Sequence, residues 1–135
     1  MISKLIEDIK REEDAGFKTG GMPYKDHLGY DTIGYGTLLP LTEKECEILL
    51  KHRLTQFVGQ VKSSLYYLDI REEAWFILYE MAYQIGLGGL LKFKNMIKCL
   101  EEKDYIGASE EMVSSKWAKQ TPNRANRLSN RMKGL

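Results

Sequence analysis

The chain has 135 residues, enough for one hydrophobic core, whether in one body or divided between two small lobes. Hydrophobic residues make up 43% and charged residues 29%, as in ordinary soluble globular proteins. Twenty basic residues against nineteen acidic ones give a net charge of +1, so the overall charge gives no reason to expect a polyanionic partner.

The first segment, residues 2–13, predicts an amphipathic helix because Ile2, Leu5, Ile6 and Ile9 recur at helical spacing. It contains no apolar run long enough for a signal peptide or a membrane anchor. We therefore expect the protein to be made in the cytoplasm, without a signal peptide.

Residues 14–41 have a different composition, rich in glycine and with tyrosines that alternate with small or polar residues. This pattern predicts short strands joined by tight turns, which form a small antiparallel sheet. From residue 42 onward the pattern is helical. Thr42 and Glu45 form a capping box at the start of a long helix that ends near residue 64.

The following helix, from about residue 70 to Ile85, is apolar on most faces and is expected to be the central buried helix, ended by the glycines at 86, 88 and 89. Further helices are expected around Phe93–Leu100 and over 104–118. Thr121 and Pro122 are expected to open the last helix.

The predicted fold is α+β, one domain over residues 1–135. The small sheet lobe is expected at 14–41, the helical lobe at 1–13 together with 65–135, and the connecting helix at 42–64. A cleft between the two lobes is the expected place for a ligand site.

The two cysteines, Cys46 and Cys99, lie in helix-forming sequence without a CxxC neighbour or a nearby histidine pair. This spacing argues against a metal site and predicts two buried free thiols, with a disulfide left open.

Two carboxylates stand out as candidates for chemistry. Glu13 lies at the end of the first helix, where the helix dipole favours the protonated carboxyl that a general acid needs. Asp26 lies in a predicted hairpin turn. Facing carboxylates, one protonated and one ionised, are what glycoside hydrolysis requires. On local grounds alone Glu13 also fits a solvated surface residue, and Asp26 a turn residue that bonds its own backbone.

The remaining candidates also have simpler interpretations. Thr32 fits ordinary strand propensity. Arg124 lies in the first turn of the last helix, where a cation opposes the dipole. The basic C-terminus fits a solvated helix face, and the alternative is binding to an anionic surface, either a cell wall or a nucleic acid. The basic residues of this C-terminus are Arg124, Arg127, Arg131 and Lys133.

The two carboxylates and four further segments occur in an informative order. The first predicted helix ends in Arg11-Glu12-Glu13, and Asp26 precedes the hairpin run TIGYG at 32–36. Then come YQIG at 83–86, SKW at 115–117 and QTPNRA at 120–125. Together they resemble the lysozymes of tailed phages, glycoside hydrolase family twenty-four, over nearly the whole chain.

The resemblance implies roles for individual residues. Glu13 corresponds to the general acid, Asp26 to the carboxylate that orients water, and Thr32 to the hydroxyl that helps to hold this water. Glu12 stays open as a rival acid, because the spacing after Glu13 departs from the family pattern. The implied reaction inverts the anomeric carbon, with the two carboxyl groups roughly 6.5–9.5 Å apart.

Substrate binding is implied for Leu38, Tyr83, Gln84 and Arg124, the last beside the acid. It is not carried over to the family's cleft positions at Met96 and Glu111, whose residue types differ here.

The function implied is a muramidase, specifically an endolysin that hydrolyses peptidoglycan for host cell lysis. It would act as a monomer, without metal or cofactor, without nucleic acid or stable membrane insertion, and after release by a holin. One alternative is a catalytically inactive relative that binds the cell wall or builds the virion. A transglycosylase and a nucleic-acid-binding helical protein are the others.

Overall fold

The computed structural model describes residues 1–13 and 17–135. The chain divides into two compact units, Met1–Leu49 and Leu50–Leu135. Helix α2 (Glu43–Ser64) begins in the first unit and ends in the second. Each unit is described by itself.

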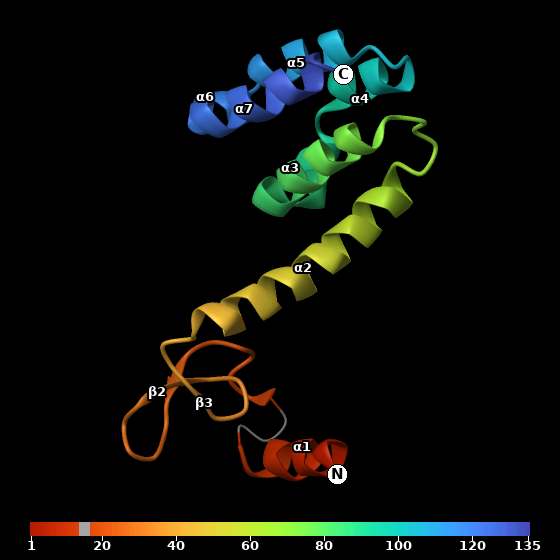
Figure 1. Cartoon of the computed structure of the whole chain (residues 1–135). Coiled ribbons are helices and arrows are strands. Elements are labelled where there is room, and N and C mark those ends of the chain that lie inside the picture. Colours follow the sequence, from red (N-terminus) through yellow and green to blue (C-terminus); the bar gives the residue numbers. More distant parts are fainter. Residues whose placement is uncertain (14–16) are drawn as a thin grey trace. The chain divides into compact units, whose positions relative to one another are not determined.

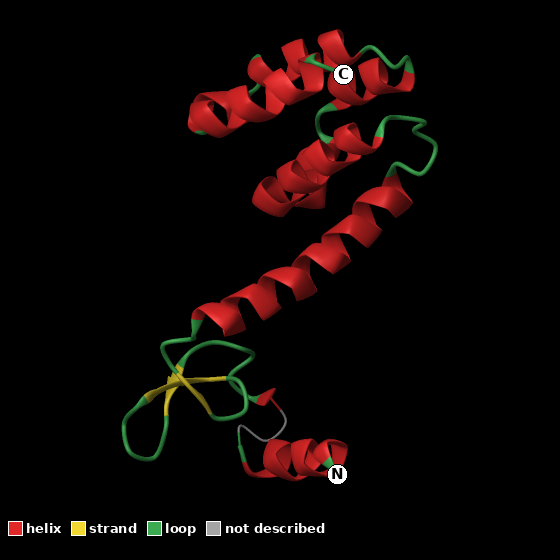
Figure 2. Ribbon diagram, viewed as in Figure 1, coloured by secondary structure: helices red, strands yellow, loops and turns green. Residues whose placement is uncertain are grey.

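The first unit contains α1 (Ile2–Glu12) and three short strands, β1 (Tyr24–Lys25), β2 (Asp31–Ile33) and β3 (Thr37–Leu38) (Figure 1). The strands, which are yellow in Figure 2, form one antiparallel sheet in the order β1-β2-β3. The predicted small antiparallel sheet is therefore confirmed. The structure places α1 in the same unit as the sheet, and the assignment of residues 1–13 to the helical lobe stays a prediction.

The capping box at the start of α2 is present as predicted. The backbone N–H of Thr42 donates to Oε1 of Glu45 at 2.9 Å, and the N–H of Glu45 donates to Oγ1 of Thr42 at 3.2 Å. This reciprocal pair satisfies two amides that have no partner within the helix. It fixes the start of the helix at the residue after Thr42.

The second unit is helical. It comprises the end of α2 with α3 (Glu72–Leu91), α4 (Lys94–Glu101), α5 (Tyr105–Val113), α6 (Lys116–Gln120) and α7 (Pro122–Lys133). Helix α5 packs against α4 and α7, and α7 also contacts α3 and α6. Together with the sheet of the first unit, these helices confirm the α+β class. Along the described ranges, no helix combines the length and apolarity needed to cross a membrane.

Helix α3 is the most buried element, as its apolar sequence predicts. Its fully or nearly fully buried side chains are Ala74, Trp75, Ile77, Leu78, Met81, Ala82 and Leu90. An all-round apolar helix is stable in water only when neighbours cover it. This helix therefore anchors the hydrophobic core of the second unit.

The expected single helix over 104–118 is wrong. The structure has two helices there, separated at Ser114 and Ser115. The Oγ of Ser115 accepts from the N–H of Ala118 at 3.2 Å and so caps the start of α6. Serine is a preferred N-cap because its hydroxyl replaces a missing helical acceptor.

The predicted burial of both thiols is also wrong, because Cys46 is exposed. Cys46 and Cys99 are both free thiols, as predicted.

The expected end of α3 at its glycines is only partly right. Gly86 has φ 78° and ψ 163°, which interrupts the helix, but helical structure resumes and continues to Leu91. That backbone region is open almost only to glycine. Gly86 therefore produces a kink rather than the end of the helix.

We expect Gly86→Ala to lower the free energy of unfolding by about 1–3 kcal/mol, because alanine is strained at that backbone conformation. Gly88→Ala is the matched control. Gly88 has helical backbone and open space where a Cβ would lie, so alanine should be neutral or stabilise by up to about 1 kcal/mol. Urea unfolding of both variants measures the difference, and equal effects would contradict the kink assignment.

Candidate active site

The sheet of the first unit places three residues in one row. Thr32 on the middle strand pairs with Tyr24 on one side and with Leu38 on the other. Directly paired residues of antiparallel strands point to the same face. Thr32 is 1% exposed, whereas Leu38 is 57% exposed. The row therefore has a buried hydroxyl at its centre and an accessible apolar side chain at its edge.

Glu13 directly follows α1 and adopts an extended backbone, with φ −109° and ψ 119°. Its N–H still donates to the carbonyl of Ile9 at 2.8 Å, which holds Glu13 to the last helical turn. Glu12 is the last residue of the helix itself. The two rival acids therefore differ in backbone conformation, so their side chains leave the helix end in different directions.

The side chain of Glu13 lies against the turn between β2 and β3. A Cβ added to Gly36 would lie 3.0 Å from Cδ and 3.2 Å from Oε2 of Glu13, closer than ordinary packing allows. Gly36 also has φ 84°, a conformation that favours glycine. The absence of a side chain at Gly36 is therefore what admits the Glu13 carboxyl to the hairpin.

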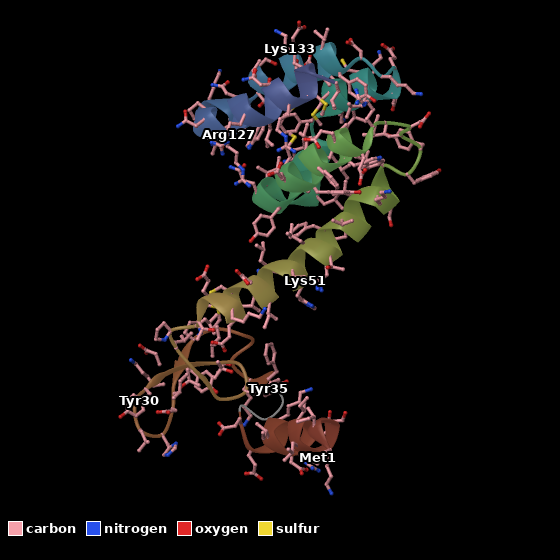
Figure 3. The ribbon with its side chains drawn as sticks, viewed as in Figure 1. Met1, Tyr30, Tyr35, Lys51, Arg127 and Lys133 are labelled. Atoms are coloured by element: carbon pink, nitrogen blue, oxygen red, sulfur yellow. The ribbon has the colours of Figure 1, made fainter. Side chains whose placement is uncertain are left out.

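Aromatic and basic side chains lie beside this contact. Tyr35, labelled in Figure 3, lies between Gly34 and Gly36 in the same turn. Its ring packs against Phe17 at a centroid distance of 5.9 Å, and Nζ of Lys10 lies 5.3 Å from the ring centroid. Helix α1 and the hairpin thus meet through the neighbours of Glu13 as well as through Glu13 itself.

Asp26 has the local turn geometry that its sequence context predicts. Its Oδ1 accepts from the N–H groups of Leu28 at 2.9 Å and Tyr30 at 2.8 Å, and its own N–H donates to the carbonyl of Tyr30 at 2.9 Å. Both side-chain bonds go to Oδ1, so any interaction with water falls to Oδ2. The turn fixes the orientation of the carboxylate.

Thr32 also has an assigned hydrogen bond. Its Oγ1 donates to the carbonyl of Tyr30 at 2.9 Å. Because the hydroxyl hydrogen is used, only the lone pairs of Oγ1 remain to accept from a water molecule. Tyr30 thus holds both Asp26 and Thr32 through its backbone.

The other candidate residues lie in the second unit. Tyr83 is 39% exposed and packs edge-on against Phe57, with ring centroids 5.9 Å apart. Oε1 of Gln84 accepts from Nε1 of Trp117 at 2.9 Å, which leaves the amide NH₂ of Gln84 for other partners. Arg124 is half-buried in the first turn of α7. Its predicted position beside Glu13, like the predicted cleft, stays a prediction.

The second unit contains a groove of about 750 Å³ that sequence reasoning missed. Its lining includes Trp117 and three lysines, Lys92, Lys94 and Lys116. Met96 and Glu111 also line it. Both fall on cleft positions of the family that the sequence resembles, and substrate binding was not carried over to them because of their residue types. The structure adds that they line the same groove of the second unit.

Comparison with known proteins identifies a family for most of the chain. A family model described as phage lysozyme matches residues 15–134. The chain belongs to the phage lysozyme family. The match begins two residues after Glu13, so it includes Asp26 and Thr32 but not the proposed acid.

Among relatives in the phage lysozyme family, two come from Dictyostelium discoideum. Probable T4-type lysozyme 1 is 27% identical and probable T4-type lysozyme 2 is 25% identical, and in both the alignment covers 95% of this chain and 92% of the relative. The pre-baseplate central spike protein Gp5 of Enterobacteria phage T4 is 24% identical over 92% of this chain but only 26% of its own length.

The basic C-terminus of this phage lysozyme family member is partly neutralised. Arg131 forms ion pairs with Glu73 at 2.6 Å and Glu80 at 2.7 Å, both on α3. The hydrogen bonding of Arg131 to the Glu73 carboxylate, in which Arg131 is the donor, is the main cause that raises the pKa of Arg131. Arg131 therefore joins α7 to α3 instead of serving as a free cation.

Among the described residues, no cluster of three or more His, Cys, Asp or Glu side chains is placed to hold a metal ion.

Proposed function

We propose that this chain hydrolyses the β-1,4 bond between N-acetylmuramic acid and N-acetylglucosamine in peptidoglycan. Membership of the phage lysozyme family supports a muramidase-like glycoside hydrolase that acts on peptidoglycan. The observation that carries the finer proposal is the approach of the Glu13 carboxyl to Gly36, which brings the acid to the same hairpin as Thr32.

The proposed reaction is a single displacement. Protonated Glu13 donates its proton to the leaving glycosidic oxygen, while a water attacks the anomeric carbon from the opposite face. Asp26 accepts a proton from that water through Oδ2, because Oδ1 is held by the turn. Thr32 holds the water through a lone pair of Oγ1. The anomeric carbon is inverted, and no metal or cofactor takes part.

Four residues are proposed to contact the substrate. Leu38 offers exposed apolar surface to a sugar ring, and Tyr83 offers a partly exposed aromatic ring. Gln84 contributes its amide NH₂, since its oxygen is bonded to Trp117. Arg124 contributes its positive charge to substrate binding.

The proposed biological role is host cell lysis by a monomeric endolysin that is made in the cytoplasm and released by a holin. The family description supports a phage setting. One observation favours the alternative of a virion component, namely the match to the phage T4 spike protein, of which this chain spans 26%. A virion component that retains the proposed site would share the same chemistry.

Digestion of purified peptidoglycan tests the proposal. We expect new reducing ends, with the α-anomer formed first as judged by NMR, because inversion of a β bond gives the α product. Anhydro sugar ends would instead indicate a transglycosylase. Binding to the wall without release of sugar ends would identify an inactive relative, and retention of the β-anomer would exclude the single displacement.

A further inference from the structure

Tyr24 forms a bridge across the turn that receives Glu13. Its phenol donates to the carbonyl of Gly34 at 2.9 Å and accepts from the N–H of Gly36 at 3.2 Å. One side chain from β1 thus binds both ends of the three-residue turn between β2 and β3. A hydroxyl that both donates and accepts uses its hydrogen and one lone pair in fixed directions.

The turn needs such a restraint because of its residues. Gly34 has φ 64° and Gly36 has φ 84°, and glycine reaches many other conformations at little cost. Without the phenol, the amide of Gly36 would lose its side-chain acceptor. The position of the Gly36 backbone would then depend on the flanking strands, which are only three and two residues long.

The residue that the phenol restrains is also the residue that the acid touches. The Glu13 carboxyl lies against Gly36, so close that a Cβ at this position would stand only 3.0 Å from Cδ of Glu13 and would force the carboxyl to shift. Movement of Gly36 therefore moves the surface against which the carboxyl rests. Proton transfer is sensitive to such movement, since displacement of a group by about 1 Å costs up to about 100-fold in rate.

We propose that Tyr24 is a positioning residue for the Glu13 acid, acting through the Gly34–Gly36 turn. It does not touch the substrate. The proposal rests on the proposed function in one respect, the assignment of Glu13 as the general acid. The new element is that the position of the Glu13 carboxyl depends on the phenol of Tyr24, eleven residues further along the chain.

The first test is Tyr24→Phe, which removes the hydroxyl and keeps the ring. We expect kcat on peptidoglycan fragments to fall about tenfold while KM changes less than about twofold, because the acid is misplaced and substrate contacts remain. Tyr66→Phe is the matched control, since Tyr66 is 81% exposed in the second unit, and it should retain wild-type kcat. Circular dichroism at the assay temperature verifies that both variants are folded. A folded Tyr24→Phe variant with wild-type kcat would overturn the proposal.

A double-mutant cycle separates positioning from general weakening of the hairpin. Glu13→Asp shortens the side chain by one methylene and withdraws the carboxyl from Gly36, leaving a slow but measurable enzyme. In that background Tyr24→Phe should cost less than about twofold, because residues that act through one another are not additive. A tenfold loss in both backgrounds would show that Tyr24 acts independently of Glu13, and the proposal would fail.

An NMR titration tests the same claim without catalysis. In the wild type, the amide resonance of Gly36 should shift as Glu13 ionises, and in Tyr24→Phe this shift should be at least halved. An unchanged shift would overturn the proposal. If the wild type releases no sugar ends, the proposed function fails, and the titration alone decides whether Tyr24 positions the Glu13 carboxyl.

Discussion

Glu13→Gln should lower the rate of peptidoglycan hydrolysis by about 10²–10⁴-fold, while Glu12→Gln should remain within about twofold of wild type. Glutamine matches the shape of glutamate but has no acidic proton to give to the leaving oxygen. Glu13 directly follows α1 with its carboxyl on Gly36, whereas Glu12 is the last residue of the helix. Reducing ends released per minute by equal amounts of folded protein measure the difference.

The pair of variants acts as its own control. Both substitutions replace a carboxyl group by an amide at the same exposed helix end, so a general effect of losing a carboxyl there would alter both rates equally. Loss of activity only in Glu12→Gln would keep the hydrolytic function and move the acid by one residue. Full activity in both folded variants would remove general acid catalysis from this helix end.

Local sequence signals predicted the elements that depend on local contacts. The capping box at Thr42 and Glu45 fixes the start of α2 through bonds between residues three apart. The apolar run of α3 required burial whichever neighbours supplied it. The break at Ser114 and Ser115 was missed because serine is tolerated inside a helix as well as at its start, and only the capping bond to Ala118 decides.

In the candidate site, too, the contacts between residues close in sequence could be predicted and the contacts between distant residues could not. The turn of Asp26 is local and could be predicted, since its partners lie within four residues. The approach of Glu13 to Gly36 and the bond from Trp117 to Gln84 join residues more than twenty positions apart. No periodicity in the sequence encodes such contacts. The resemblance to a family could propose the residues, but not the hydrogen bonds that hold them.

Leu78→Ala should lower the free energy of unfolding by about 2–5 kcal/mol, the second large effect that we expect. Leu78 is fully buried on α3, where neighbouring helices surround it. Removal of three side-chain carbons loses transfer free energy and leaves a cavity that packed neighbours fill only partly. Since a domain of this size has about 5–15 kcal/mol of stability, the variant should unfold at clearly lower urea concentration.

Ile106→Ala provides the matched control, because it deletes the same number of carbons from a side chain on α5 that is 55% exposed. We expect a change within about 0.5 kcal/mol, as at other exposed helix positions. Helix α3 also carries Tyr83 and Gln84, so the activity of Leu78→Ala distinguishes two interpretations. Activity that falls only with the unfolded fraction would mean that α3 serves the site as a rigid support. A greater loss at a temperature where the variant is fully folded would mean that the packing of Leu78 also sets the positions of Tyr83 and Gln84.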